Sequence, residues 1–130
     1  MGKKTGVAEK PKLSEASLQI QCVSWFKWHY KNRIIWHNVN EGKRTVWGGR
    51  HLKRQGMTKG VPDLTIPEPF GAYSGLYIEL KVKPNNVTEA QEEMLSLLAN
   101  RNYMVRVCWS FEEFIATVKE YFGQEERKAA

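Results

Sequence analysis

Cysteines, long apolar runs and acidic residues are all scarce in this chain of 130 residues. Its 2 cysteines are too few for a disulfide framework. No apolar run is long enough to cross a membrane, and the chain shows no signal-peptide pattern. These absences exclude a disulfide-stabilised secreted domain and a membrane-spanning protein, so we expect a cytoplasmic protein that is not secreted.

Basic residues are in excess, with 20 lysines and arginines against 14 aspartates and glutamates and a net charge of +6. This balance favours an acidic partner, either nucleic acid or an anionic membrane. The length and the 42% hydrophobic content suit one compact domain. We expect that domain at residues 13–122, between disordered charged tails at residues 1–12 and 123–130.

The cations concentrate between Asn40 and Lys59, where Glu41 is the only acid and 4 glycines are interspersed. This composition predicts a flexible basic arm that binds nucleic-acid phosphates, with Trp47 stacking on a base. The alternative is a solvated loop whose tryptophan lies in the core. The expected nucleic-acid contacts are Lys43, Arg44, Trp47, Arg50, Lys53, Arg54 and Lys59.

Two short apolar runs, Leu64–Ile66 and Leu76–Val82, predict neighbouring strands. The prolines and glycines between them predict a β-hairpin with a long connection. Because residues two apart share a face of a strand, Tyr77, Glu79 and Lys81 point one way and the apolar residues point the other. One face of this strand is therefore expected to pack into the core, and the other is expected to carry the side chains of a reactive site.

Across such a hairpin Asp63 and Glu79 approach each other, and two close carboxylates repel unless a cation lies between them. A hard divalent ion, Mg²⁺ or Mn²⁺, suits these oxygen ligands, with the Leu80 carbonyl as a further ligand. Lys81 then lies beside the ion and can hold a phosphate or assist proton transfer. The alternative is an amphipathic strand with a solvent-facing Glu and Lys, but the joint pattern favours a site that hydrolyses phosphodiester bonds.

The order and spacing of Pro62-Asp63 and Glu79-Leu80-Lys81 resemble the PD-(D/E)xK nuclease superfamily. Within it, the segments Asn38–Arg44, Leu52–Met57 and Gly60–Leu64 resemble the VRR-NUC (virus-type replication-repair nuclease) domain.

The resemblance covers residues 14–122 and implies a restriction-endonuclease-like fold. It also implies that Asp63 and Glu79 bind the metal, that Lys81 is catalytic and that Glu15 completes the acidic site. Stand-alone members of the family, many of them from phages, are similar to Holliday-junction resolvases and act as dimers. The length of this chain fits that type.

Three more polar residues are candidates for the site. Glu15 follows Ser14 at the start of a helical segment, where an acid also favours the helix dipole, and Gln19 lies one turn further on the same face. Gln91 follows a helix start at Thr88, and the family often shows a glutamine at its place. Helix capping is the alternative for Glu15 and simple surface exposure is the alternative for Gln91, while no local chemistry demands a site role for Gln19.

The remaining patterns predict the scaffold. Apolar residues at helical spacing mark a core-facing helix at 14–31, namely Leu18, Cys22, Trp25, Phe26 and His29. Further elements are expected as a strand at 34–39, a helix beginning at 88, a strand at 103–108 and a helix capped at Ser110. The predicted class is α/β of mixed α+β type, in the order αβββαβα, with a four-stranded mixed sheet flanked by helices.

The sequence therefore predicts a metal-dependent endodeoxyribonuclease that acts on branched DNA, with no organic cofactor. Junction preference comes from the resemblance, because the residues alone leave a four-way junction, a flap, a nick and a plain duplex open. A homodimer follows from the need for paired cuts. The alternatives are a nicking or flap nuclease of the same fold, or a DNA-binding module that has lost activity.

Overall fold

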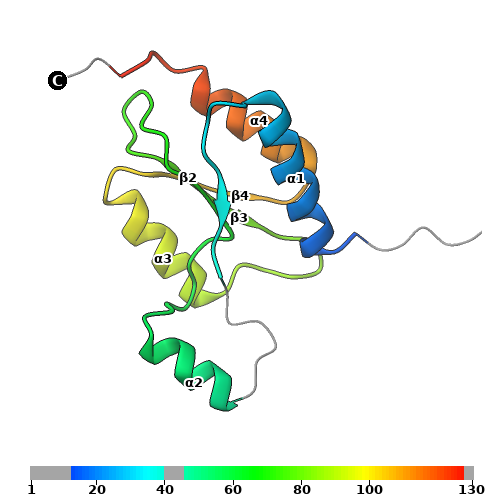
Figure 1. Ribbon diagram of the computed structural model, residues 1–130, viewed down its shortest axis with the longest axis vertical. Helices are drawn as coiled ribbons and strands as arrows, with labels where there is room; N and C mark the ends of the chain where they lie inside the picture. The colour runs from blue at the N-terminus through cyan, green and yellow to red at the C-terminus, as the bar shows by residue number, and fades with distance from the viewer. Residues whose placement is uncertain (1–12, 40–45, 128–130) are drawn as a thin grey trace, which may run out of the picture.

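The computed structural model describes residues 13–39 and 46–127 of the chain, without the side chains of residues 46–49. Four strands form one mixed sheet in the order β1-β2-β3-β4 (Figure 1). The elements are α1 (Glu15–His29), β1 (Trp36–His37), α2 (Val46–Arg54), β2 (Leu64–Ile66), β3 (Leu76–Leu80), α3 (Glu89–Ala99), β4 (Met104–Cys108) and α4 (Phe111–Phe122). None of the helices in these two ranges has the length and apolar character needed to cross a bilayer.

The sheet confirms the predicted fold class and strand pairing. β1 pairs with β2 and β2 with β3 in antiparallel fashion, while β3 and β4 are parallel and are joined through α3. The first strand was expected over residues 34–39, but pairing extends only over Trp36 and His37. Asn38 instead donates its backbone N–H to the Asp63 carbonyl and its side chain to the Pro62 carbonyl, which ties this edge to the start of β2.

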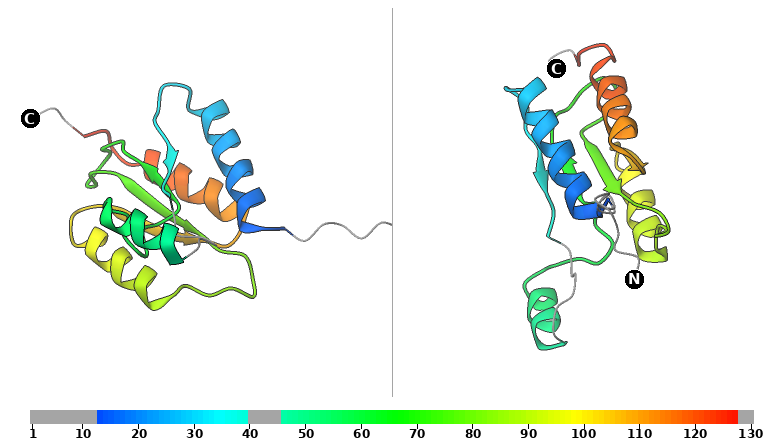
Figure 2. Two further views of the ribbon diagram at one scale, coloured as in Figure 1. Left: turned by 60° about the horizontal axis from the view of Figure 1, so that its bottom comes forward. Right: turned by 90° about the vertical axis from the view of Figure 1, so that its right-hand side faces the viewer.

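The core lies between the sheet and the pair α1 and α4, which pack together on one face, while α3 packs against β4 (Figures 1 and 2). Alternation along β3 sends Leu76, Ile78 and Leu80 into this core and turns Tyr77 and Glu79 the other way. From the helices, the fully buried side chains are Leu18, Cys22, Phe26, Phe114, Val118 and Tyr121.

Helix α1 begins where the sequence predicted, because Ser14 and Ser17 form a reciprocal capping box. Leu18, Cys22 and Phe26 lie on its buried face. The sequence also predicts that His29 faces the core, but this residue is exposed, where its ring stacks on Trp25 and its Nδ1 lies 2.9 Å from the Trp25 carbonyl oxygen. The helix ends at His29.

Helix α2 corrects the prediction of a flexible basic arm and adds an element to the predicted order. Residues Val46–Arg54 form a helix that contains no acid and projects from the body of the domain (Figure 1). Because Arg50, Lys53 and Arg54 are spaced at i, i+3 and i+4, they share one face of this helix. Gly56, with φ of +105°, reverses the chain after it.

Candidate active site

Two carboxylates meet where β2 begins and β3 ends. Asp63 directly precedes β2, and Glu79 lies on β3 one residue beyond Ile78, which pairs with the first residue of β2. The Leu80 backbone N–H donates to Asp63 Oδ2 at 2.7 Å, which fixes the aspartate against β3. Just after the strand, Lys81 Nζ lies 3.7 Å from Glu79 Oε2. The structure thus brings together the two predicted metal ligands and the predicted catalytic lysine.

Burial dominates the electrostatics of this cluster. Glu79 is only 2% exposed and Lys81 only 6% exposed. Loss of solvent raises the pKa of Glu79 to about 8, and the neighbouring charge of Asp63 adds to the rise. Burial also raises the pKa of Asp63, and the hydrogen bond from Leu80 opposes that shift. Without a cation, the site therefore favours retention of a proton by the carboxyl pair.

Gln91 is bound to the cluster and also caps α3. The Gln91 Oε1 accepts a hydrogen bond from the backbone N–H of Thr88. The Thr88 hydroxyl accepts a hydrogen bond from the backbone N–H of Gln91, so the two residues form a capping box. The Gln91 Nε2 donates to Glu79 Oε2 at 2.8 Å. Gln91 therefore caps α3 and also contacts Glu79 in the acidic pocket, whereas the alternative from the sequence was a surface glutamine.

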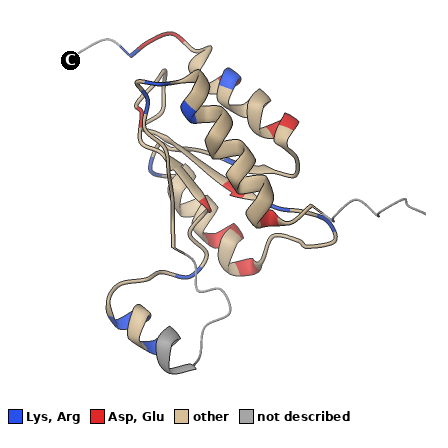
Figure 3. Ribbon diagram, turned by 45° about the vertical axis from the view of Figure 1, so that its right-hand side comes forward, with Lys and Arg blue, Asp and Glu red and all other residues tan. Residues whose placement is uncertain are grey.

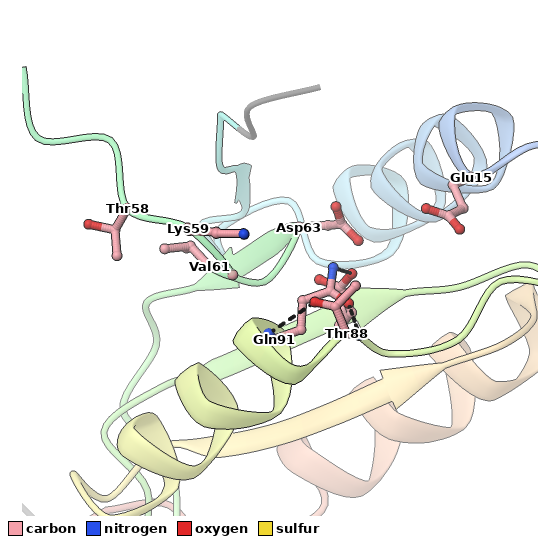
Figure 4. A pocket seen from close by; sticks show the side chains of 9 residues that line it. Glu15, Thr58, Lys59, Val61, Asp63, Thr88 and Gln91 are labelled. Atoms are coloured by element: carbon pink, nitrogen blue, oxygen red, sulfur yellow. Dashed lines mark hydrogen bonds between the residues drawn. The ribbon is translucent and has the colours of Figure 1, made fainter. Parts of the chain in front are cut away.

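Glu15 and Gln19 line different cavities although they lie one helical turn apart. Glu15 lines the pocket that contains Asp63 and Glu79 (Figure 4). Its Oε2 accepts a hydrogen bond of 2.9 Å from Asn85. Gln19 instead lines a different hollow between α1 and β1. Asn85 escaped the sequence analysis because nothing local marks it as the partner of a residue 70 positions away.

The acidic pocket has a volume of about 300 Å³ and a basic lip. Thr58, Lys59, Gly60 and Val61 form the side opposite the acids, and Lys59 points into the pocket (Figure 4). This lip is held against the start of α3, because Gly60, with φ of +84°, packs on the backbone of Ala90. A phosphate entering the pocket would meet Lys59 on one side and the carboxylates on the other.

The donor set fits a hard divalent cation. Glu79 Oε1 is buried and has no hydrogen-bond partner among the residues that the structure describes, although buried carboxylate oxygens normally find one. Among residues 13–39 and 46–127, no group of three or more His, Cys, Asp or Glu side chains converges as a closed metal cage. Mg²⁺ uses one or two protein carboxylates and keeps room for waters and substrate phosphates. Asp63 and Glu79, whose Oε1 lacks a partner among the described residues, match that requirement.

The predicted DNA-binding residues lie on one side of the acidic pocket, as far as they are described. Arg50, Lys53 and Arg54 are exposed on α2, and Lys59 is exposed on the lip. Figure 3 marks basic residues in blue on α2 and on the segment that leads from it back to the body of the domain. Lys43, Arg44 and the side chain of Trp47 lie outside the described residues. The described cations therefore lie on α2 and on the lip of the acidic pocket, with the uncharged residues 55–58 between them.

The raised pKa of Glu79 predicts how stability depends on pH when no metal is present. A carboxyl whose pKa is about 8 in the folded protein and 4.5 as a free side chain stabilises the fold below pH 4.5, and this stabilisation is lost as pH rises to about 8. In chelator, the free energy of unfolding should fall across this range by at least about 1 kcal/mol. Glu79→Gln should flatten that fall, as measured by urea denaturation at pH 5.5 and pH 8. Parallel pH profiles for the two proteins would contradict the assignment.

Comparison with known proteins identifies the family. The model of the VRR-NUC domain matches residues 13–112. A solved structure described as "VRR_NUC domain protein" superposes with a TM-score of 0.74 at 27% sequence identity, covering 90% of this chain and 94% of the other. No curated protein matches the chain. The chain therefore belongs to the VRR-NUC family, and with it to the nucleases of the PD-(D/E)xK type, hydrolases that act on DNA and use divalent metal ions.

Proposed function

We propose that the chain is a structure-selective endodeoxyribonuclease that cuts branched DNA, in particular four-way junctions, and that it uses Mg²⁺ or Mn²⁺. The observation that carries the catalytic part is the convergence of Asp63, Glu79 and Lys81, with Glu79 Oε1 left buried and unpartnered. Binding alone would gain nothing from two buried carboxylates facing a phosphate, which argues against an inactive DNA-binding module.

Each side chain has a distinct task in this proposal. Asp63 and Glu79 would hold the ion, with the Leu80 carbonyl as a further oxygen donor, and Glu15, which lines the same pocket, would bind one of the waters of the ion. When bound, such an ion stabilises negative charge on the phosphate and makes a water more acidic. Gln91 donates to Glu79 and so fixes the orientation of that carboxylate. Gln19, which lines the neighbouring hollow, would contact the substrate rather than the ion.

Lys81 has the position of a group that acts on the transition state. Its ammonium is nearly buried and lies 3.7 Å from Glu79 Oε2, so it is held in place before the substrate arrives. From there it can donate to a non-bridging phosphate oxygen whose charge increases during the reaction. Lys59, exposed on the opposite lip, is suited to attracting the substrate.

The cations of α2 should carry much of the DNA affinity. Arg50→Ala and Arg54→Ala are each expected to weaken DNA binding and to lower the slope of log affinity against log salt concentration by about 1. Fluorescence anisotropy at several salt concentrations measures both quantities. Arg101→Ala is the matched control, because Arg101 is an exposed arginine at the C-terminal end of α3. Slopes equal to that of the control would show that α2 makes no phosphate contacts.

We further propose a two-fold dimer, which would present two acidic pockets to one junction. The edge of the sheet supports it, because within the described residues β1 pairs with no strand but β2, and the exposed apolar side chains of Ile20, Ile34 and Trp36 lie on or near this edge. Sedimentation of the wild type and of Ile20→Glu would detect such a dimer. A wild-type monomer at assay concentrations would exclude it.

The test of the whole proposal is cleavage of a labelled four-way junction beside its linear duplex arms, with Mg²⁺, with Mn²⁺ and with chelator. Metal-dependent cuts placed symmetrically across the junction would support a resolving enzyme. Equal cutting of all substrates would support nuclease activity but exclude selectivity for junctions. A preference for flaps or nicks would favour a nicking or flap nuclease of the same fold. Tight binding without cleavage would favour an inactive module.

A further inference from the structure

A second hollow lies between α2 and the edge of the sheet, and its lining differs from that of the acidic pocket. It has a volume of about 380 Å³. Val39, Leu52, Met57 and Val61 supply apolar walls, and Gln55 adds an amide at the end of α2. None of the described residues that line it is charged. Such a surface suits a neutral, flat and partly apolar group that can also accept or donate hydrogen bonds.

This neutral hollow adjoins the acidic pocket. Thr58 and Val61 line both cavities, so the two depressions meet at these residues. A DNA strand whose phosphate lies between Lys59 and the carboxylates therefore passes beside the neutral hollow. The exposed cations of α2 lie along the same side and can hold the phosphates that follow.

We infer that the neutral hollow binds a nucleobase that has turned out of the helical stack next to the scissile phosphate. This inference rests on the proposed nuclease function. The charges are complementary. The neutral base of a nucleotide suits the uncharged hollow, and its anionic phosphate suits the basic lip. A paired and stacked base in a duplex would not reach the hollow, whereas a base at a branch, a bulge or a flap can enter it.

The site would explain selectivity for branched DNA without any reading of sequence. Turning a base out of a duplex costs free energy, and the cost is smallest for a nucleotide that is already unpaired. Contacts with Val39, Leu52 and Met57 repay this cost for any base, because every base has an apolar face. Branched DNA is then preferred because its bases enter the hollow more easily, and not because the protein recognises the branch itself.

The test measures binding in chelator, so that it needs no cleavage. The probes are a duplex with one unpaired 2-aminopurine nucleotide and the same duplex fully paired. Val39→Trp fills the hollow from a side chain that is 55% exposed, and Leu97→Trp is the matched control from a side chain that is 46% exposed on α3. Thermal unfolding of both variants checks that the fold is intact.

We expect the wild type to bind the unpaired probe more tightly than the paired one and to change the fluorescence of 2-aminopurine on binding. Val39→Trp should lose most of that fluorescence change and weaken binding of the unpaired probe about tenfold, with the paired probe and the salt dependence unchanged. Leu97→Trp should behave as the wild type. Equal affinities of the wild type for both probes, or a normal response in Val39→Trp, would overturn the inference and leave the nuclease function standing. Failure to bind either probe would overturn both.

Discussion

Replacing Glu79 by glutamine is expected to lower the rate of DNA cleavage by about 10³-fold or more, while DNA affinity changes only a few-fold. The amide keeps the size of the side chain but removes the negative charge that a divalent ion requires. The loss should appear in kcat, because the residues expected to bind DNA lie on α2 and the lip rather than on β3. Single-turnover cleavage and anisotropy measure the two effects separately, and calorimetry with Mg²⁺ should show weaker metal binding.

The control for this experiment is Glu93→Gln, which removes an exposed acid from the same helix as Gln91. It should cleave DNA at nearly the wild-type rate. Lys81→Met should resemble Glu79→Gln in cleavage but retain metal binding, because an ammonium is not a ligand. If Glu79→Gln cuts DNA normally, Glu79 is not a metal ligand and the assignment of the site is wrong.

The second large effect is expected from Gly60→Ala, which should destabilise the protein by about 3 kcal/mol or more and lower Tm by about 10 °C. Gly60 has φ of +84°, which strains any other residue, and a Cβ at this position would overlap the backbone carbonyl of Ala90. The lip that carries Lys59 would have to move away from α3. Differential scanning calorimetry measures the stability, and cleavage of the same DNA measures the displacement of the lip.

Gly56→Ala separates backbone strain from steric overlap. Gly56 also has a positive φ, of +105°, but a Cβ added there would meet none of the described residues within 4 Å. This variant should therefore lose only about 1 kcal/mol. Equal losses for the two variants would show that the contact with Ala90 is unimportant and that strain alone determines the cost.

The sequence predicted those parts of the fold whose signals are local. Alternation along Leu76–Leu80 predicted both a buried face and a chemical face, since a strand turns each successive side chain to the opposite side. The caps at Ser14, Thr88 and Ser110 predicted where three helices begin, because the N-cap hydroxyl accepts a backbone N–H two or three residues later. The pairing of Asp63 with Glu79 followed from the same strand geometry.

The sequence did not predict features that depend on spatial neighbours or on a weak local signal. Gly48 and Gly49 lie inside α2, and because glycine is a poor helix former the segment was interpreted as a flexible arm. The hydrogen bonds from Asn85 to Glu15 and from Gln91 to Glu79 join elements whose approach only the folded chain determines. Gln19 shares a helical face with Glu15, but Glu15 lines the acidic pocket and Gln19 lines the hollow between α1 and β1.

The two hydrogen bonds of the Gln91 amide connect the first turn of a helix with an acidic side chain on a strand. Helix ends open more readily than the rest of a folded chain. When the first turn of α3 opens on heating, the same amide leaves Glu79, and the carboxylate loses its fixed orientation while the sheet is still intact. We therefore expect cleavage to be lost reversibly at temperatures below the unfolding transition, so that the first residues of α3, rather than the core, would limit the temperature at which the protein acts on DNA.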